Sequence, residues 1–129
     1  MSYQKEIGRI GEQLVANWLK SKGYIIVRQN FTTGYGEIDI VAENPKSVVF
    51  VEVKTRRKNS LVAPKDAVSF SKQTKLAKTA RIFLQRAYMK SFPYRFDIAE
   101  VTYKTDASGE PKFSLNYIKN AFTYNLFDD

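Results

Sequence analysis

The chain contains no cysteine and no histidine in its 129 residues. Without cysteine there are no disulfides, no thiolate zinc sites and no cysteine nucleophiles. Without histidine there is no imidazole general base and no histidine-bound metal. Any metal site must therefore be built from oxygen ligands, which favours Mg²⁺, Mn²⁺ or Ca²⁺.

Long apolar runs are also missing from the sequence. No stretch approaches the roughly 18 apolar residues that a membrane span requires. The N-terminal segment, MSYQKEIGRIGEQLVANWLK, is amphipathic, carries acidic residues and lacks the continuous apolar region of a signal peptide. We therefore expect a cytoplasmic protein with no membrane partner.

Charge of one sign predominates. Lysine and arginine number 21 against 13 acidic residues, which gives a net charge of +8. Such a surplus on a small protein indicates a polyanionic partner, nucleic acid first, although solubility alone would also account for it. The length and the 43% hydrophobic content fit one domain spanning residues 1–129 with an ordinary core.

The segment from residue 36 to residue 57 predicts a β-hairpin. Residues 39–42 and 48–51 are apolar or β-branched runs of strand length, and Asn-Pro-Lys-Ser between them has turn composition. If 44–47 form the loop, Glu43 pairs with Val48 and Asp39 faces Glu52. Directly opposed side chains have Cβ atoms about 4.5–5.5 Å apart, so both carboxylates would reach one ion.

Lys54 belongs to the same predicted site. Strand side chains alternate, so Glu52 and Lys54 share one face. Asp39 and Glu52 could hold Mg²⁺ or Mn²⁺ with the backbone carbonyl of Val53 as a further ligand, and Lys54 could orient or deprotonate water or stabilise developing negative charge. The alternative is two crossed ion pairs on a surface hairpin, which would contribute only about 0–1 kcal/mol.

Helical spacing of apolar residues predicts a helix from about Tyr3 to Lys22, with Gly23 at its C-terminal cap. Glu12 lies at the edge of the apolar stripe, beside Gly8 and Gly11. Two glycines at this position indicate close approach by a strand or a ligand. Glu12 could complete the outer sphere of the metal or bind a second ion; the alternative is a rim residue paired with a lysine.

A second helix is predicted from an N-cap at Ser71 to about Lys90, after a loop that spans residues 59–67. Its apolar face consists of Leu76, Ala80, Phe83, Leu84 and Ala87. The remaining faces are basic, with no acidic residue between Ser71 and Ser91, which fits either phosphate contact or a solvated surface. The basic nucleic-acid contacts predicted from this helix and from the segment after Glu52 are Arg56, Arg57, Lys72, Lys75 and Lys78.

Further strands are predicted at residues 24–28, 95–103 and 112–119. A loop is expected over 29–36, a turn over 106–109, and a short helix in the aromatic tail. The resulting order is α-β-β-β-α-β-β. It predicts an α/β fold, a mixed sheet flanked by helices.

The residues Glu12, Asp39, Glu52 and Lys54, in this order, resemble the site of the PD-(D/E)xK nuclease superfamily. Within it the chain resembles the YraN-like family of small bacterial proteins, over stretches that run nearly end to end: GRIGEQLVANWLKSKGYIIVRQNF, GEIDIVA, VVFVEVKTR, KQTKLAKTARIFL, RFDIAEV and IKNAF. The resemblance implies a restriction-endonuclease-like fold with these four residues as the catalytic site.

Two details of the motifs differ from the superfamily pattern. Ile38 stands before Asp39 in place of proline. Some members add a Gln-x3-Tyr motif on the following helix; Gln73 matches its start and Ala77 replaces its tyrosine. On this match Gln73 joins the predicted nucleic-acid contacts.

The arrangement is also similar to archaeal Holliday-junction resolvases, which act as homodimers on branched DNA. The resemblance implies a Mg²⁺- or Mn²⁺-dependent DNA endonuclease, selective for branched or damaged DNA, and leaves a homodimer open. Two alternatives remain: a non-catalytic nucleic-acid-binding protein that kept the fold, and a subunit of a larger DNA-processing complex that makes contact through its aromatic tail.

Overall fold

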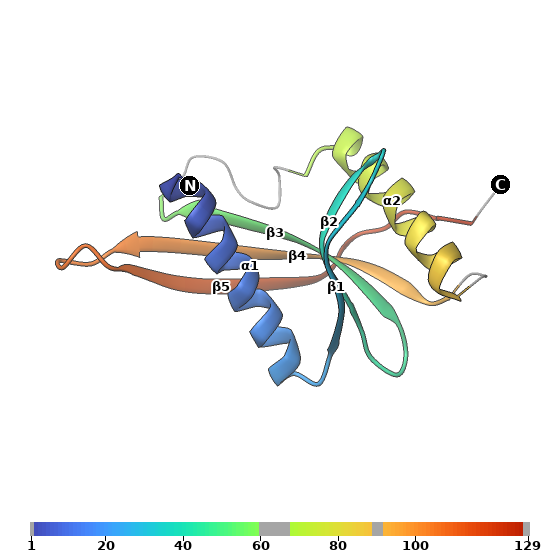
Figure 1. Cartoon of the computed structure of the whole chain (residues 1–129), viewed down its shortest axis with the longest axis horizontal. Helices are drawn as coiled ribbons and strands as arrows, with labels where there is room; N and C mark the ends of the chain where they lie inside the picture. Colours follow the sequence, from blue (N-terminus) through green and yellow to red (C-terminus); the bar gives the residue numbers. More distant parts are fainter. Residues whose placement is uncertain (1, 60–67, 89–91, 128–129) are drawn as a thin grey trace.

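The computed structural model describes residues 2–59, 68–88 and 92–127, which form two helices and one five-stranded sheet (Figure 1). The predicted order α-β-β-β-α-β-β and the α/β class are confirmed. In chain order the elements are α1 (Tyr3–Ser21), β1 (Ile25–Thr33), β2 (Gly36–Glu43), β3 (Val48–Arg57), α2 (Phe70–Tyr88), β4 (Tyr94–Thr105) and β5 (Pro111–Phe122).

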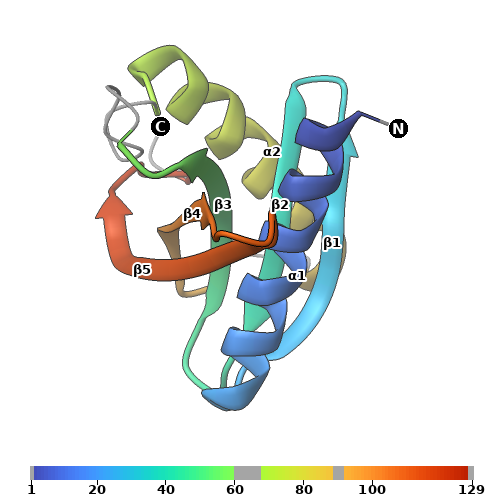
Figure 2. The same ribbon diagram turned by 90° about the vertical axis from the view of Figure 1, so that its left-hand side faces the viewer.

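The strands lie in sequence order across the sheet, β1-β2-β3-β4-β5. Only β3 and β4 are parallel, and α2 lies in the connection between them. Parallel neighbours need such a crossover, whereas the antiparallel pairs are joined by short turns. The two helices lie on opposite faces of the sheet (Figures 1 and 2).

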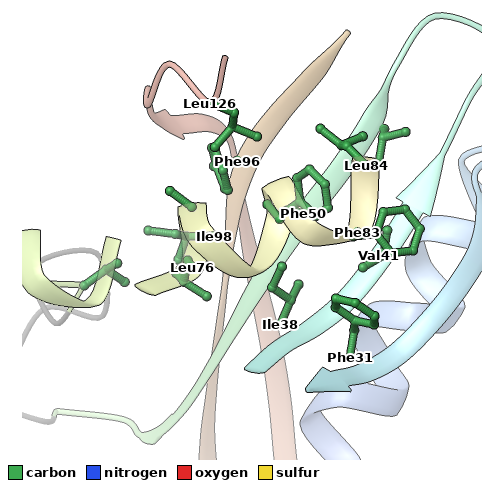
Figure 3. Close-up of a cluster of buried hydrophobic side chains, with 14 residues drawn as sticks. Phe31, Ile38, Val41, Phe50, Leu76, Phe83, Leu84, Phe96, Ile98 and Leu126 are labelled. Carbon is green, nitrogen blue, oxygen red and sulfur yellow. The ribbon is translucent and has the colours of Figure 1, made fainter. Parts of the chain in front are cut away.

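Each helix covers its own hydrophobic core. On one face, Val15, Ala16 and Leu19 of α1 pack on the sheet. On the other face, α2 packs on Ile38 and Phe50 (Figure 3). The α2 residues buried in that core are Leu76, Ala77, Ala80, Phe83 and Leu84. The predicted apolar face of α2 is thus confirmed except at Ala87, which is exposed.

The ends of both helices have identifiable caps. The Ser2 side chain accepts a hydrogen bond from the Lys5 N–H at 3.2 Å. Gly23 takes a left-handed φ of 90° just after α1, which confirms its predicted role at the helix end. The predicted N-cap Ser71 is wrong, because α2 already begins at Phe70 and the Ser69 hydroxyl accepts the Lys72 N–H at 3.2 Å.

Two segments differ from the prediction. Residues 29–33, expected to be a loop, continue β1, because Phe31 is buried against the α2 side and its backbone pairs with Ile38. Residues 120–122 of the tail continue β5, and 123–127 contain no helix. The rest of the predicted 59–67 loop after residue 59, residues 89–91 and residues 128–129 lie outside the described residues.

Strands β2 and β3 pair in the predicted register. Glu43 pairs with Val48 and Val41 with Phe50, and the last pair is Ile40 with Val51. Beyond this pair β2 continues beside β1, and β3 continues beside β4 (Figure 1). We call the point where β2 and β3 separate, between Asp39 and Glu52, the strand fork.

The side-chain alternation of β2 is interrupted at the strand fork. Ile38 and Val41 both belong to the core under α2, whereas Ile40 and Ala42 belong to the core under α1. A regular strand would place Ile38 and Ile40 on one face. The alternation of side chains therefore shifts by one residue at Asp39. The direction of this carboxylate is consequently not the one that a regular strand would give.

In the part of the chain that the structure describes, no helix has the length and apolar character needed to cross a membrane.

Candidate functional site at the strand fork

Asp39 is held at the fork by the backbone of β3. Its Oδ2 accepts a hydrogen bond from the Val53 N–H at 2.8 Å. The β2–β3 pairing has already ended at Val51, so the carboxylate takes the place of a strand partner. The ladder thus stops one pair short of the predicted Asp39–Glu52 pair. Asp39 nevertheless lies beside the part of β3 that carries Glu52.

The environment of Asp39 favours its protonated form. Burial raises the pKa of Asp39 to about 7, and the negative charge of Glu52 adds to the increase. The Val53 N–H opposes this shift, while Glu12 and Glu37 add smaller increases. A cation at the fork would relieve the repulsion among these carboxylates.

Glu52 is a buried carboxylate paired with two lysines. Its side chain is 8% exposed, and one oxygen, Oε1, lies 3.0 Å from Lys72 Nζ and 3.4 Å from Lys54 Nζ. Lys54 is on the same strand, as predicted, whereas Lys72 comes from the first turn of α2. Lys72, predicted as a nucleic-acid contact, thus lies within the site itself.

The two lysines have different proton affinities. Burial lowers the pKa of Lys54, and the neighbouring Lys72 ammonium adds to the decrease. The pKa of Lys72 is raised against the effect of its burial, by its contact with Lys54 and by the charge of Glu52. Lys54 is therefore the lysine that gives up its proton more readily.

Glu12 approaches the fork from α1. Its Oε1 accepts a hydrogen bond from Asn30 Nδ2 at 3.0 Å. Burial raises the pKa of Glu12, the Asn30 hydrogen bond opposes the rise, and the charges of Glu37 and Glu52 add to it. The polar partner of Glu12 is thus an asparagine, where the alternative interpretation expected a lysine.

Asn30 was not among the residues predicted for the site. It lies in β1 between the pairs Gln29–Ile40 and Phe31–Ile38, at the position opposite Asp39. Its φ of 54° is left-handed, a conformation that asparagine tolerates better than most residues. This local irregularity of β1 accompanies the contact between the Asn30 amide and Glu12.

Gly11 brings α1 close to β3. A Cβ atom at Gly11 would collide with the Thr55 hydroxyl, whereas one at Gly8 would meet nothing within 4 Å. The predicted close approach is therefore confirmed at Gly11 and wrong at Gly8. Because α1 contacts β3 at this point, the next residue, Glu12, lies beside the fork.

The other predicted nucleic-acid contacts are spread over the molecule. Lys75 and Lys78 are exposed on α2, and Lys78 Nζ lies 5.2 Å from the centre of the Tyr35 ring. Gln73 Nε2 donates to the Val68 carbonyl at 3.1 Å, close to the start of α2. Arg56 and Arg57 lie at the far end of β3.

The buried Asp97 is separate from this site. It accepts hydrogen bonds from Arg95 Nε at 3.0 Å, from the Tyr117 hydroxyl at 2.5 Å and from the Asn120 N–H at 2.8 Å. These contacts tie β4 to β5 where their register shifts after Phe96. Its role is structural, because its hydrogen bonds hold β4 and β5 together, and β2 is not a neighbour of either strand.

The donors at the fork fit a hard divalent cation. Within residues 2–59, 68–88 and 92–127, no three acidic side chains lie close enough together to hold one ion. The candidate ligands are two carboxylates, Asp39 and Glu52, and the Val53 backbone carbonyl. Mg²⁺ commonly binds through one or two carboxylates and keeps several waters, so this oxygen-only set suits it.

Comparison with known proteins identifies a family for this chain. The fold and the fork define an α/β protein with a mixed sheet and an oxygen-donor site where two strands separate. The chain matches the uncharacterised protein family UPF0102 over residues 11–101, a range that contains all four predicted site residues. The chain belongs to this family, which confirms the resemblance to YraN-like proteins.

Individual relatives match over most of their length. A UPF0102 protein of Clostridium botulinum (strain 657 / Type Ba4) is 42% identical over 119 residues, which cover 92% of this chain and 94% of the relative. A UPF0102 protein of Clostridium perfringens (strain ATCC 13124) is 41% identical over 120 residues, covering 93% and 96%.

Proposed function

We propose that this protein is a cytoplasmic, Mg²⁺- or Mn²⁺-dependent DNA endonuclease that hydrolyses phosphodiester bonds. The observation that carries the proposal is the strand fork. Two carboxylates, Asp39 and Glu52, come from separating strands, and the Lys54 ammonium lies 3.4 Å from Glu52. Stability alone gives little reason for such a cluster, since neighbouring carboxylates repel.

Each residue has a distinct role in this proposal. Asp39, Glu52 and the Val53 carbonyl would hold the ion, and a bound ion would supply charge stabilisation at the phosphate and a more acidic water. Lys54, whose pKa is lowered, accepts a proton at Nζ from the attacking water or donates a hydrogen bond to a phosphate oxygen. Glu12, oriented by Asn30, belongs to the outer sphere.

DNA is the proposed substrate because of the charge of the molecule. The net charge is +8, and Lys75 and Lys78 are exposed on α2, the helix that also supplies Lys72 to the site. Cationic side chains beside a hydrolytic site neutralise phosphates and hold the strand. Selectivity for branched or damaged DNA and a homodimeric state remain part of the proposal through the resemblance to junction resolvases.

The second candidate is a non-catalytic nucleic-acid-binding protein or a subunit of a DNA-processing complex. The observation that favours it is the charge balance at Glu52. Lys54 and Lys72 already neutralise this carboxylate, and no cluster of three acidic side chains occurs among the described residues. A protein that only binds DNA would need no ion at the fork.

Cleavage assays separate the two candidates. Purified protein is incubated with end-labelled linear DNA and four-way-junction DNA, with Mn²⁺ and with EDTA. The Glu52→Gln variant should lose cleavage, because it keeps the shape of the side chain and removes the charged ligand. Glu110→Gln, in the exposed turn between β4 and β5, is the matched control and should cleave as wild type does. Equal cleavage by Glu52→Gln would refute the assignment.

A further inference from the structure

A pocket of about 520 Å³ lies at the far end of β3, away from the strand fork. Its walls come from the first turns of α1, from the end of β3 and from β4, and they include Tyr3, Gln4, Arg56, Arg57, Lys58 and Tyr103. The volume lies within the range of about 300–1,000 Å³ that is typical of small-molecule sites. The pocket is therefore large enough for a nucleotide.

The pocket is strongly cationic. Arg56, Arg57 and Lys58 line it in succession, and its described lining contains no acidic residue. Three adjacent cations without a counter-charge repel one another, and they gain most from an anionic ligand. Arginine in particular suits phosphate, because its planar guanidinium donates two parallel hydrogen bonds.

Arg56 precedes Arg57 on β3, so its side chain points to the face of Glu52 and Lys54 and not to that of Arg57. Its Nε is buried, and no group among the described residues accepts a hydrogen bond from it. Buried donors are nearly always paired, so an exception of this kind needs an explanation, such as a ligand or a water. The neighbouring Arg57 guanidinium lies 5.8 Å from the centre of the Tyr103 ring, where a cation–π contact holds it at the pocket.

An aromatic side chain completes the pocket. Tyr3 lines it and is 54% exposed, whereas Tyr103 is buried beneath Arg57. An exposed ring next to cations is the combination by which proteins bind single strands, with the phosphate on the cations and the base stacked on the ring. In a duplex the bases are already stacked on one another, so they do not occupy such a surface.

The pocket and the strand fork lie along the same strand. From Glu52 to Arg57, β3 pairs with β4 but no longer with β2. The three residues from Lys54 to Arg57 span roughly 10 Å at the usual strand rise. The pocket is therefore within reach of a short DNA segment bound at the strand fork.

We propose that the pocket binds one nucleotide of a single-stranded segment of DNA, with its phosphate on Arg57 and Lys58 and its base on Tyr3. This proposal rests on the proposed function for the identity of its ligand. It specifies the substrate class: DNA with an unpaired flank close to the cleaved bond. Arg56 adds positive charge from the adjacent position of β3.

Binding in EDTA tests the pocket without any need for catalysis. Fluorescence anisotropy is measured with a labelled 5′-phosphorylated hexathymidylate and with a labelled blunt duplex. The Arg57→Gln, Lys58→Gln double variant should bind the hexathymidylate at least about tenfold more weakly and the duplex about as wild type does. The matched control, Lys75→Gln with Lys78→Gln, removes the same charge from α2 and should weaken mainly the duplex.

Equal losses for both DNAs in the Arg57→Gln, Lys58→Gln variant would overturn the proposal, because they would indicate a general charge effect. Unchanged hexathymidylate binding would also overturn it. Arg57→Gln alone, on a side chain that is exposed, serves as the second variant if the double variant melts below wild type. It should still weaken hexathymidylate binding severalfold.

Two further probes identify the ligand. Tyr3→Leu should weaken hexathymidylate binding severalfold and leave binding of an abasic phosphodiester hexamer unchanged. Millimolar inorganic phosphate should not displace the hexathymidylate; full displacement would reduce the pocket to a simple anion site. If pocket binding holds while wild type fails to cleave any DNA with Mn²⁺, the proposed function fails and the pocket remains.

Discussion

At the scale of single residues, the protonation of Asp39 makes the stability of the metal-free protein depend on pH. Its folded pKa of about 7 lies above the ordinary value of 3.8 for aspartate. The folded state therefore binds more protons than the unfolded state between these two pH values. The free energy of unfolding therefore falls as pH rises from 3.8 towards 7, because the carboxyl ionises in the unfolded state before it ionises in the folded state.

Asp39→Asn removes this titration and keeps an oxygen that can accept the Val53 N–H. Relative to wild type in EDTA, the variant should gain roughly 2–3 kcal/mol in free energy of unfolding between pH 5 and pH 8. Urea denaturation at several pH values measures the difference. If the free energies of unfolding of the two proteins change with pH in parallel, the pKa of Asp39 is not raised by folding.

Burial raises the pKa of Glu12, and Asn30 is the neighbour that opposes this rise. The Asn30 hydrogen bond lowers the pKa of Glu12 against the effect of burial. Asn30→Gly keeps the left-handed backbone accessible and removes the donor, so the pKa of Glu12 should rise further. Carboxyl ¹³C NMR titration follows this residue directly. If the titration of Glu12 is the same in both proteins, Asn30 does not act on it.

Helix and strand periodicity predict that the four site residues lie near one another, and the structure brings them together at the strand fork. Strand alternation and one turn length predict that Asp39 faces Glu52, whereas in the structure the pairing ends at Ile40–Val51 and Asp39 accepts the Val53 N–H. Asn30 and Lys72 could not be found in this way. Asn30 stands in a polar segment typical of a loop, and Lys72 is one of several lysines on α2, so its contact with Glu52 depends on how the helix packs on the sheet.

At the scale of elements, the two glycines of α1 allow a matched comparison. Gly8→Ala should stabilise the protein by up to about 1 kcal/mol, because it removes a helix penalty in open space. Gly11→Ala should destabilise it by about 1–3 kcal/mol. The new methyl group collides with the Thr55 hydroxyl, and the β-branched Thr55 side chain has little freedom to move away.

Urea denaturation of both variants checks this comparison. Thr55→Ala combined with Gly11→Ala should recover most of the loss, because it removes the hydroxyl that the methyl group meets. A Gly11→Ala variant as stable as Gly8→Ala would mean that α1 does not press on β3 at this position. Glu12 would then not be fixed beside the fork.

Element prediction succeeded where apolar periodicity was strong and failed where pairing decided the outcome. Both helices and the central strands follow their hydrophobic patterns. The second half of β1 is polar apart from Phe31, and it becomes a strand because it pairs with β2. The N-cap of α2 was misplaced because Ser69 and Ser71 offer the same chemistry two residues apart, and only the position of the first turn distinguishes them.

At the scale of the whole molecule, the net charge of +8 predicts a steep loss of DNA affinity with salt. Each neutralised phosphate contributes a slope of about −0.9 to log K against log salt. Replacing Lys75 and Lys78 by glutamine should flatten the slope by up to about two units if both contact phosphate. Lys72 contributes less than these two because it is paired with Glu52.

Lys20→Gln with Lys22→Gln, at the other helix, is the control for this measurement and should change the slope less. Anisotropy titrations with a linear duplex at four salt concentrations give the slopes. Identical slopes for wild type and for the α2 variant would show that the basic exterior of α2 is only solvated.

The overall order of elements and the family could be predicted from the sequence, but the pocket at the end of β3 could not. Its walls join residues from positions 3 to 103, which meet only after α1 has crossed the sheet and β4 has paired with β3. Arg56 and Arg57 were predicted as nucleic-acid contacts from their charge alone. Their relation to Tyr3 and Tyr103 required the structure.

The central claim is that Asp39 and Glu52 together bind a divalent cation. Thermal melting with and without Mn²⁺ tests it most directly, because an ion that binds only the folded state stabilises it by about 2.7 kcal/mol at a hundredfold excess over its dissociation constant. Wild type and the Glu110→Gln control should melt several degrees higher with Mn²⁺, and the Asp39→Asn, Glu52→Gln double variant should not. Melting of wild type that is indifferent to millimolar Mn²⁺ and Mg²⁺, with and without DNA, would contradict the claim and favour a protein that binds nucleic acid without cleaving it.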